Sequence, residues 1–166
     1  SQACTTFVGQ NYGAGQLKRC RKTLFLCLIE DAVATAAAIG IVLLSGRFLL
    51  SIFNNDPAVI DLGYVRLVTI FFAYIFSMLY EVMSGYLRGF GISLTPAILT
   101  TLGVCGVRIV WIAAVFPKSR TFETIMTAYP VSLSLTAVLI FIALLIAHPS
   151  RRYASKFVTQ KATDNN

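Results

Sequence analysis

The sequence predicts an all-α integral membrane protein, and three observations support this fold class. The chain has 166 residues, of which 57% are hydrophobic and 13% are charged. A soluble domain has about 25% charged residues, so the low charge and the mean hydropathy of +0.75 favour a protein that lies in a bilayer. Long apolar segments, each near the ~20 residues that a membrane helix needs, alternate with short polar turns.

The apolar segments predict about four full transmembrane helices. These spans are placed at residues 23–44, 57–89, 95–116 and 124–147. Residues 1–8 are too few to cross a membrane, and we expect them to be the end of a further helix. The transmembrane region then covers residues 1–150, and residues 151–166 form a basic tail.

The basic residues indicate the orientation of the chain in the membrane. The net charge is +7, and most Lys and Arg residues gather at residues 18–22 and 151–161. These clusters flank apolar segments, which is the positive-inside pattern and not a nucleic-acid surface. We therefore expect a multi-pass protein of the inner (plasma) membrane, in contact with the lipid bilayer, with a cytoplasmic C-terminus and no nucleic acid.

Several turns carry local signals. The run GQNYGAG at residues 9–15 has three glycines, which break a helix and allow positive φ. Residues 46–56 are expected to form the turn on the opposite side, with Asp56 as the N-cap of the next helix and Pro57 at its first position. In the third span, Gly103 and Gly106 would allow a neighbouring helix to approach closely.

A polar stripe runs along the second span. Steps of three and four residues place five side chains on one helix face: Tyr74, Ser77, Glu81, Ser84 and Arg88. The other faces of this helix are apolar. An acid inside a membrane helix is costly, so Glu81 is a candidate functional group.

Among the other charged residues of the predicted spans, three lie well inside the membrane. Glu30 and Asp31 are adjacent, so they face different directions on a helix. We expect at least one of them to face a protein interior or a wet cavity, or to pair with a base of another segment. Arg108 is a possible partner for Glu81, and this pair would keep Glu81 charged and structural.

The chain shows no pattern typical of an enzyme or a metal centre. Its four cysteines have neither CxxC nor metal-ligand spacing, and its single histidine, His148, stands beside Pro149 at a helix end. We therefore expect no enzyme activity, no metal and no cofactor.

Three motifs together resemble the multidrug and toxic compound extrusion (MATE) family. GQNYGAG followed by KRCRK resembles the loop after the second helix of each half, FNNDPAVI the next outer loop, and SGYLRGFG the second cytoplasmic loop. They occur in the right order and spacing, and the resemblance covers nearly the whole chain. The two cytoplasmic motifs contribute Gly9, Gln10, Asn11, Gly13, Gly15, Arg88 and Gly89.

This resemblance implies a twelve-helix transporter of two lobes, of which the chain would form most of the C-terminal six-helix lobe. Such proteins export drugs or organic cations in exchange for sodium ions or protons. The partners would then be a missing N-terminal lobe and small amphipathic or cationic substrates. A lipid-linked oligosaccharide flippase of the same superfamily and a small membrane scaffold protein are the alternatives.

The candidate site residues can be compared with those of the family. Some members of the family place a coupling carboxylate one turn before Glu81, where this chain has Ser77. Glu81 lies on the same helix face, so it is either a displaced equivalent or a structural acid. The ion-coupling candidates are Glu81, Ser77 and Asp31. The substrate-cavity candidates are Tyr74 and Tyr80, because drug cavities contain aromatic side chains, together with Arg108.

Overall fold

The computed structural model describes residues 1–117, 122–147 and 149, and these residues form helices and turns without any strand. The helical segments are α1 (Gln2–Gly13), α2 (Leu17–Phe53), α3 (Pro57–Gly89), α4 (Leu94–Thr100), the π-helix η1 (Thr101–Gly106), α5 (Val107–Ala114) and α6 (Phe122–Ala147). The expected basic tail and His148 lie outside the described residues.

Four helical stretches within the described residues are long and apolar enough to cross a membrane. They are Leu17–Phe53, Pro57–Gly89, Leu94–Ala114 and Thr124–Ala147. This result confirms the predicted all-α membrane fold class. At a rise of about 1.5 Å per residue, the 37 residues of α2 span about 55 Å, so its ends extend beyond a hydrocarbon core of about 30 Å.

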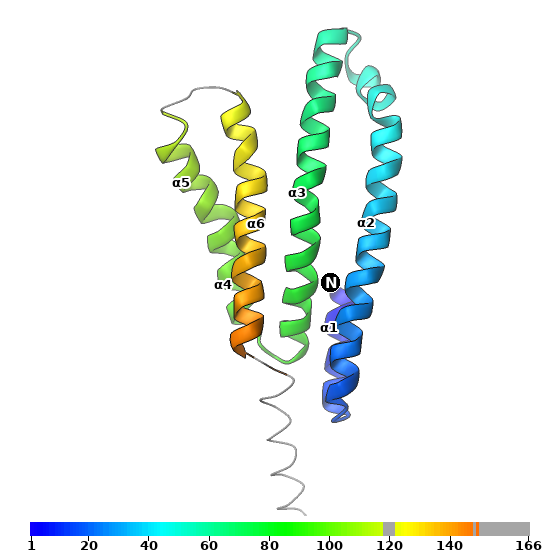
Figure 1. Cartoon of the computed structure of the whole chain (residues 1–166), viewed down its shortest axis with the longest axis vertical. Helices are drawn as coiled ribbons and strands as arrows, with labels where there is room; N and C mark the ends of the chain where they lie inside the picture. The colour runs from blue at the N-terminus through cyan, green and yellow to red at the C-terminus, as the bar shows by residue number, and fades with distance from the viewer. Residues whose placement is uncertain (118–121, 148, 150–166) are drawn as a thin grey trace, which may run out of the picture.

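Helix α3 is the centre of the arrangement, because it packs against α1, α2 and α6 (Figure 1). Helices α2 and α3 form a long antiparallel pair, and α6 packs against the stretch from α4 to α5. The α1–α2 and α3–α4 turns lie at the same end of the molecule, and the α2–α3 turn lies at the opposite end (Figure 1). The two motif loops therefore share one end, as the sequence predicts.

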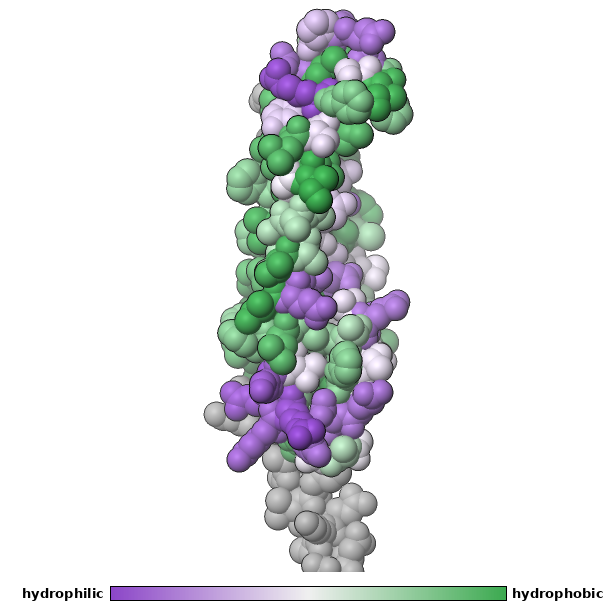
Figure 2. Space-filling view, turned by 90° about the vertical axis from the view of Figure 1, so that its right-hand side faces the viewer, coloured by the Kyte–Doolittle hydropathy of each residue, from purple (hydrophilic) through white to green (hydrophobic). Residues whose placement is uncertain are grey.

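The outer surface of the molecule is suited to lipid. On the face shown in Figure 2, hydrophobic residues cover most of the length of the molecule, hydrophilic residues gather toward both ends, and a smaller hydrophilic group lies between them. Large apolar side chains such as Phe25, Val33, Leu44 and Phe48 on α2 are exposed. An apolar surface of this extent is typical of a protein that contacts a membrane.

The start of α3 agrees with the sequence prediction. The Asp56 carboxylate accepts a hydrogen bond from the Ala58 backbone N–H at 2.9 Å, and Pro57 occupies the first helical position. The cap satisfies a backbone donor that no carbonyl within the helix can reach.

Asp56→Ala is expected to lower the free energy of unfolding by about 1 kcal/mol, because the Ala58 N–H loses its cap. Thermal unfolding of the purified complete protein in detergent micelles measures this change. Asn55→Ala is the matched control, since the side chain that caps the helix belongs to the next residue. An equal loss in both variants would contradict the capping role.

The glycine run does not break the first helix where we expected. Helix α1 continues through Gly9 to Gly13, and left-handed backbone occurs within this run at Gly15, where φ is 69°. Inside the helix, the Asn11 side chain donates to the Phe7 carbonyl at 2.8 Å. The terminal carbonyls of the helix accept from the backbone of the turn, since the Ala14 N–H donates to the Gln10 carbonyl at 3.0 Å and the Gly15 N–H to the Tyr12 carbonyl at 2.9 Å.

The turn at the opposite end is shorter than we expected. Helix α2 does not stop at Gly46 but continues to Phe53. Gly46 faces the Tyr64 ring of α3, and Arg47 forms an ion pair with Asp61 at 3.0 Å. These contacts with α3 hold the last turns of α2 in place, so tertiary packing overrides the local glycine signal.

The third span contains a break in helix type that the sequence did not reveal. Its residues run through α4, η1 and α5 without a turn. Gly103 packs against Thr136 of α6, whereas a side-chain carbon at Gly106 would meet nothing within 4 Å. The predicted close approach of a neighbouring helix therefore occurs at Gly103 but not at Gly106.

Candidate functional site

A polar pocket of about 260 Å³ lies between α3 and α4 near the end where these helices are joined. It is lined by Glu81, Ser84, Arg88, Ser93, Pro96, Ala97, Thr100 and Thr101. The pocket thus brings three of the five stripe residues together with hydroxyl groups from the next helix. Two charged and four hydroxyl-bearing side chains within apolar helices make this pocket the main candidate site.

The two charged side chains of this pocket face one another loosely. Arg88 Nη2 lies 4.0 Å from Glu81 Oε2, and the side chains are 42% and 47% exposed. The Arg88 Nε also donates to the Ser84 carbonyl at 3.3 Å, which anchors the guanidinium on α3. An ion pair at this distance and exposure contributes little to stability, so both charges can bind other groups.

The Ser84 hydroxyl in the pocket wall is a buried polar group without a hydrogen-bond partner among the described residues. Ser84 as a whole is only 4% exposed. A buried polar group without a partner costs about 1–3 kcal/mol, so such groups are rare in folded proteins. Because this oxygen has less than 1 Å² of accessible surface, a ligand or water reaches it only after the pocket wall moves.

The α4 side of the pocket is built by a helical pattern. Ser93, the N-cap of α4, and Thr100 are seven residues apart and so share one face, and Thr101 follows at the first position of η1. Thr101 Oγ1 donates to the Ala97 carbonyl at 2.9 Å, and the π-helix begins at this residue. Such π segments are rare and are frequent at functional sites. Sequence reasoning missed these three hydroxyls, and the seven-residue spacing of Ser93 and Thr100 is the signal that could have identified two of them.

The other stripe residues lie outside this pocket. Tyr74 is 51% exposed and packs against Phe71 with ring centroids 6.1 Å apart. The Ser77 hydroxyl contacts the Tyr80 hydroxyl at 3.4 Å. Tyr80 is buried in the core with Ile140 of α6. The structure therefore places Tyr80 in the core between α3 and α6.

Arg108 does not pair with Glu81. Its Nε donates to the Ser132 hydroxyl at 3.1 Å, and its guanidinium carbon lies 4.3 Å from the centre of the Tyr129 ring. Both partners belong to α6, so the Arg108 side chain of α5 connects these two helices. The possible Arg108–Glu81 pair is wrong for this structure, and Arg88 is the base that faces Glu81.

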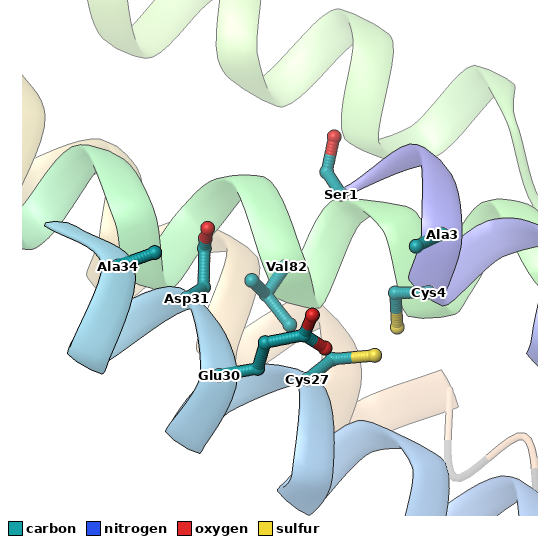
Figure 3. Close-up of a pocket in the computed structure, with 8 residues that line it drawn as sticks. All are labelled: Ser1, Ala3, Cys4, Cys27, Glu30, Asp31, Ala34 and Val82. Atoms are coloured by element: carbon teal, nitrogen blue, oxygen red, sulfur yellow. The ribbon is translucent and has the colours of Figure 1, made fainter.

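A second pocket, of about 150 Å³, holds the remaining ion-coupling candidate (Figure 3). Glu30 and Asp31 of α2 both line it, together with Cys4 and Cys27, whose side chains point toward one another. Neither acid forms an ion pair with a described residue. The expectation that an acid of this pair faces a cavity is therefore met, while Asp31 and Glu81 belong to different pockets.

Within the described ranges, no cluster of three or more His, Cys, Asp or Glu side chains is suited to a metal ion.

The residues of the first and third sequence motifs lie at the same end of the molecule, where α1 packs on the end of α3. A side-chain carbon at Gly89 would lie 2.7 Å from Val8 Cβ, so this glycine allows the two helices to touch. Thr5 Oγ1 donates to the Gly85 carbonyl at 3.0 Å across the same contact. The first motif occupies α1 and its following turn, and the second ends α3: Gly9, Gln10, Asn11, Gly13 and Gly15, then Arg88 and Gly89.

Apolar helices of membrane-spanning length, with a polar pocket set among them, are typical of a multi-pass α-helical membrane protein. A family model described as MatE matches residues 1–113, which include α1 to η1 and most of α5. The chain therefore belongs to the MatE family and is a membrane transporter of the MATE superfamily, a group of transporters and not of enzymes. No curated protein and no solved structure gives a significant match to the chain.

Proposed function

We propose that the protein is a secondary active transporter that exports drugs or other small organic molecules in exchange for sodium ions or protons. The observation that carries this proposal is the position of Glu81, a carboxylate in a polar pocket within an apolar helix. Ionisable residues in such positions commonly belong to ion or substrate pathways. No resident cofactor is needed for this activity, because the coupling ion is cargo.

In the proposed cycle, Glu81 binds the coupling ion and the substrate in turn. A proton or a sodium ion neutralises the carboxylate when the pocket is open to the outside. When the pocket opens to the cytoplasm, release of that ion leaves a charged carboxylate for the substrate. Two partners that compete for one carboxylate are exchanged and not carried together, so the gradient of the ion drives the export.

The distribution of basic residues supports a proposal for the orientation of the protein in the membrane. Four basic residues begin α2 and Arg88 ends α3, so one end of the molecule is positively charged. By the positive-inside rule this end is cytoplasmic, and we propose a plasma-membrane location with the pocket near the cytoplasmic side. A second helical lobe is the proposed partner across which access to the pocket alternates.

Transport by the complete protein in proteoliposomes tests this function. A fluorescent organic cation is expected to accumulate when a proton or a sodium gradient is imposed, and to equilibrate without a gradient. The gradient that drives accumulation identifies the coupling ion. Equal dye movement with and without either gradient would contradict secondary active transport.

A further inference from the structure

We propose that the pocket between α3 and α4 binds zwitterionic small molecules, which carry a carboxylate and an ammonium group on one skeleton. The proposal rests on the proposed function, because it names the substrate class of the Glu81 pocket. It narrows the broad expectation of amphipathic or cationic substrates to molecules whose two charges match the two charges of the site.

The balance of charge in the pocket carries the argument. Glu81 and Arg88 are the only charged side chains that line it among the described residues. An organic cation would be attracted by Glu81 but repelled by Arg88 a few ångströms away, and an organic anion would meet the reverse. A molecule with both charges gains from both side chains.

The geometry of the ion pair leaves room for this exchange of partners. Its closest approach is 4.0 Å, longer than a charge-assisted hydrogen bond, and both side chains remain accessible. A ligand carboxylate can therefore replace Glu81 as the partner of Arg88. The ligand ammonium group replaces Arg88 as the partner of Glu81, so neither charge loses its counter-ion.

The uncharged groups of the pocket add specificity and limit the size of the ligand. The buried Ser84 side chain forms the wall of the pocket beside Arg88. Ser93, Thr100 and Thr101 contribute further hydroxyls on the opposite wall. A volume of about 260 Å³ lies below the usual range of drug-sized sites, which favours a ligand of about the size of an aromatic amino acid.

Three compounds of similar shape test the proposal by calorimetry on the purified complete protein in detergent. Phenylalanine carries both charges, phenethylamine only the cation, and 3-phenylpropionate only the anion. Phenylalanine is expected to bind about tenfold more tightly than either analogue, because each analogue leaves one charged side chain without its ligand partner. Arg88→Gln should reduce the affinity for phenylalanine to that for phenethylamine, and Glu81→Gln to that for 3-phenylpropionate.

Two further variants show whether a change is specific to the pocket. Arg88→Lys keeps the positive charge and should retain most of the preference for phenylalanine. Arg47→Gln removes the base of the other described ion pair, at the far end of α2, and should leave all three affinities unchanged. Equal affinity for phenylalanine and phenethylamine, a preference that survives Arg88→Gln, or no binding of any compound would overturn the proposal.

The binding measurement needs no gradient, so it is independent of the transport test. Gradient-driven export of a cationic dye without a preference for phenylalanine would overturn the substrate class and keep the proposed function. A preference for phenylalanine in a protein without gradient-driven export would support the zwitterion site and remove the coupling mechanism.

Discussion

Glu81→Gln in the complete protein is expected to abolish gradient-driven export while the protein still inserts into the membrane. The amide is similar in size to the carboxylate but binds neither a proton nor a sodium ion at physiological pH. Because the Glu81–Arg88 contact is long and half exposed, its loss should cost little stability. Dye accumulation in proteoliposomes, normalised to the amount of inserted protein, measures the effect.

Asp61→Asn is the matched control for this variant. It makes the same acid-to-amide change on α3, at an exposed position paired with Arg47. Normal export by Glu81→Gln would exclude Glu81 as the coupling carboxylate and leave it a structural role. A second variant that combines Glu81→Gln with Ser77→Asp moves the acid back by one turn on the same face. Partial recovery of export in this variant would support the view that Glu81 is a displaced coupling acid.

Gly103→Ala is expected to destabilise the protein, although Ala favours a helix over Gly by about 1 kcal/mol. A methyl group at this position would lie 3.0 Å from Thr136 Cβ and 3.2 Å from Thr136 Cα. Because the second contact is with backbone, η1 and α6 must move apart. Overpacking of this kind costs about 1–3 kcal/mol. Thermal unfolding in detergent micelles should therefore show a lower midpoint.

Gly106→Ala provides a control of opposite sign in the same π-helix. A methyl group at Gly106 meets no atom within 4 Å, so this variant should keep or slightly raise the unfolding temperature. If both variants shift the midpoint in the same direction and by the same amount, the close contact at Gly103 does not limit stability.

The sequence predicts most of the fold because the relevant signals are local. Apolar segments of membrane length, and the Asp56–Pro57 start of α3, each fix one feature without reference to distant residues. The errors have the opposite character. The continuation of α2 beyond Gly46 depends on Tyr64 and Asp61, which belong to another helix. A glycine has different consequences in open water and against a neighbouring ring, and only the tertiary structure distinguishes them.

The candidate site was predictable in part for the same reason. Glu81, Ser84 and Arg88 lie on one helix, so their shared face follows from spacing alone. The partner helix that completes the pocket does not follow from spacing. Arg108 illustrates the limit, because its distance along the chain allowed a pair with Glu81. The structure instead places Tyr129 beside its guanidinium.

The π-helix couples the two ends of the third span through its winding. Residues in an α-helix are separated by about 100° around the axis, and the wider turns of a π-helix change the direction in which all later side chains point. Thr100 and Thr101 line the pocket where η1 begins, and Arg108 contacts α6 just after η1 ends. A change from π to α winding within Thr101–Gly106 would therefore rotate Arg108 away from α6 or the threonines away from the pocket. The winding of η1 therefore links the geometry of the pocket to that of the α5–α6 contact.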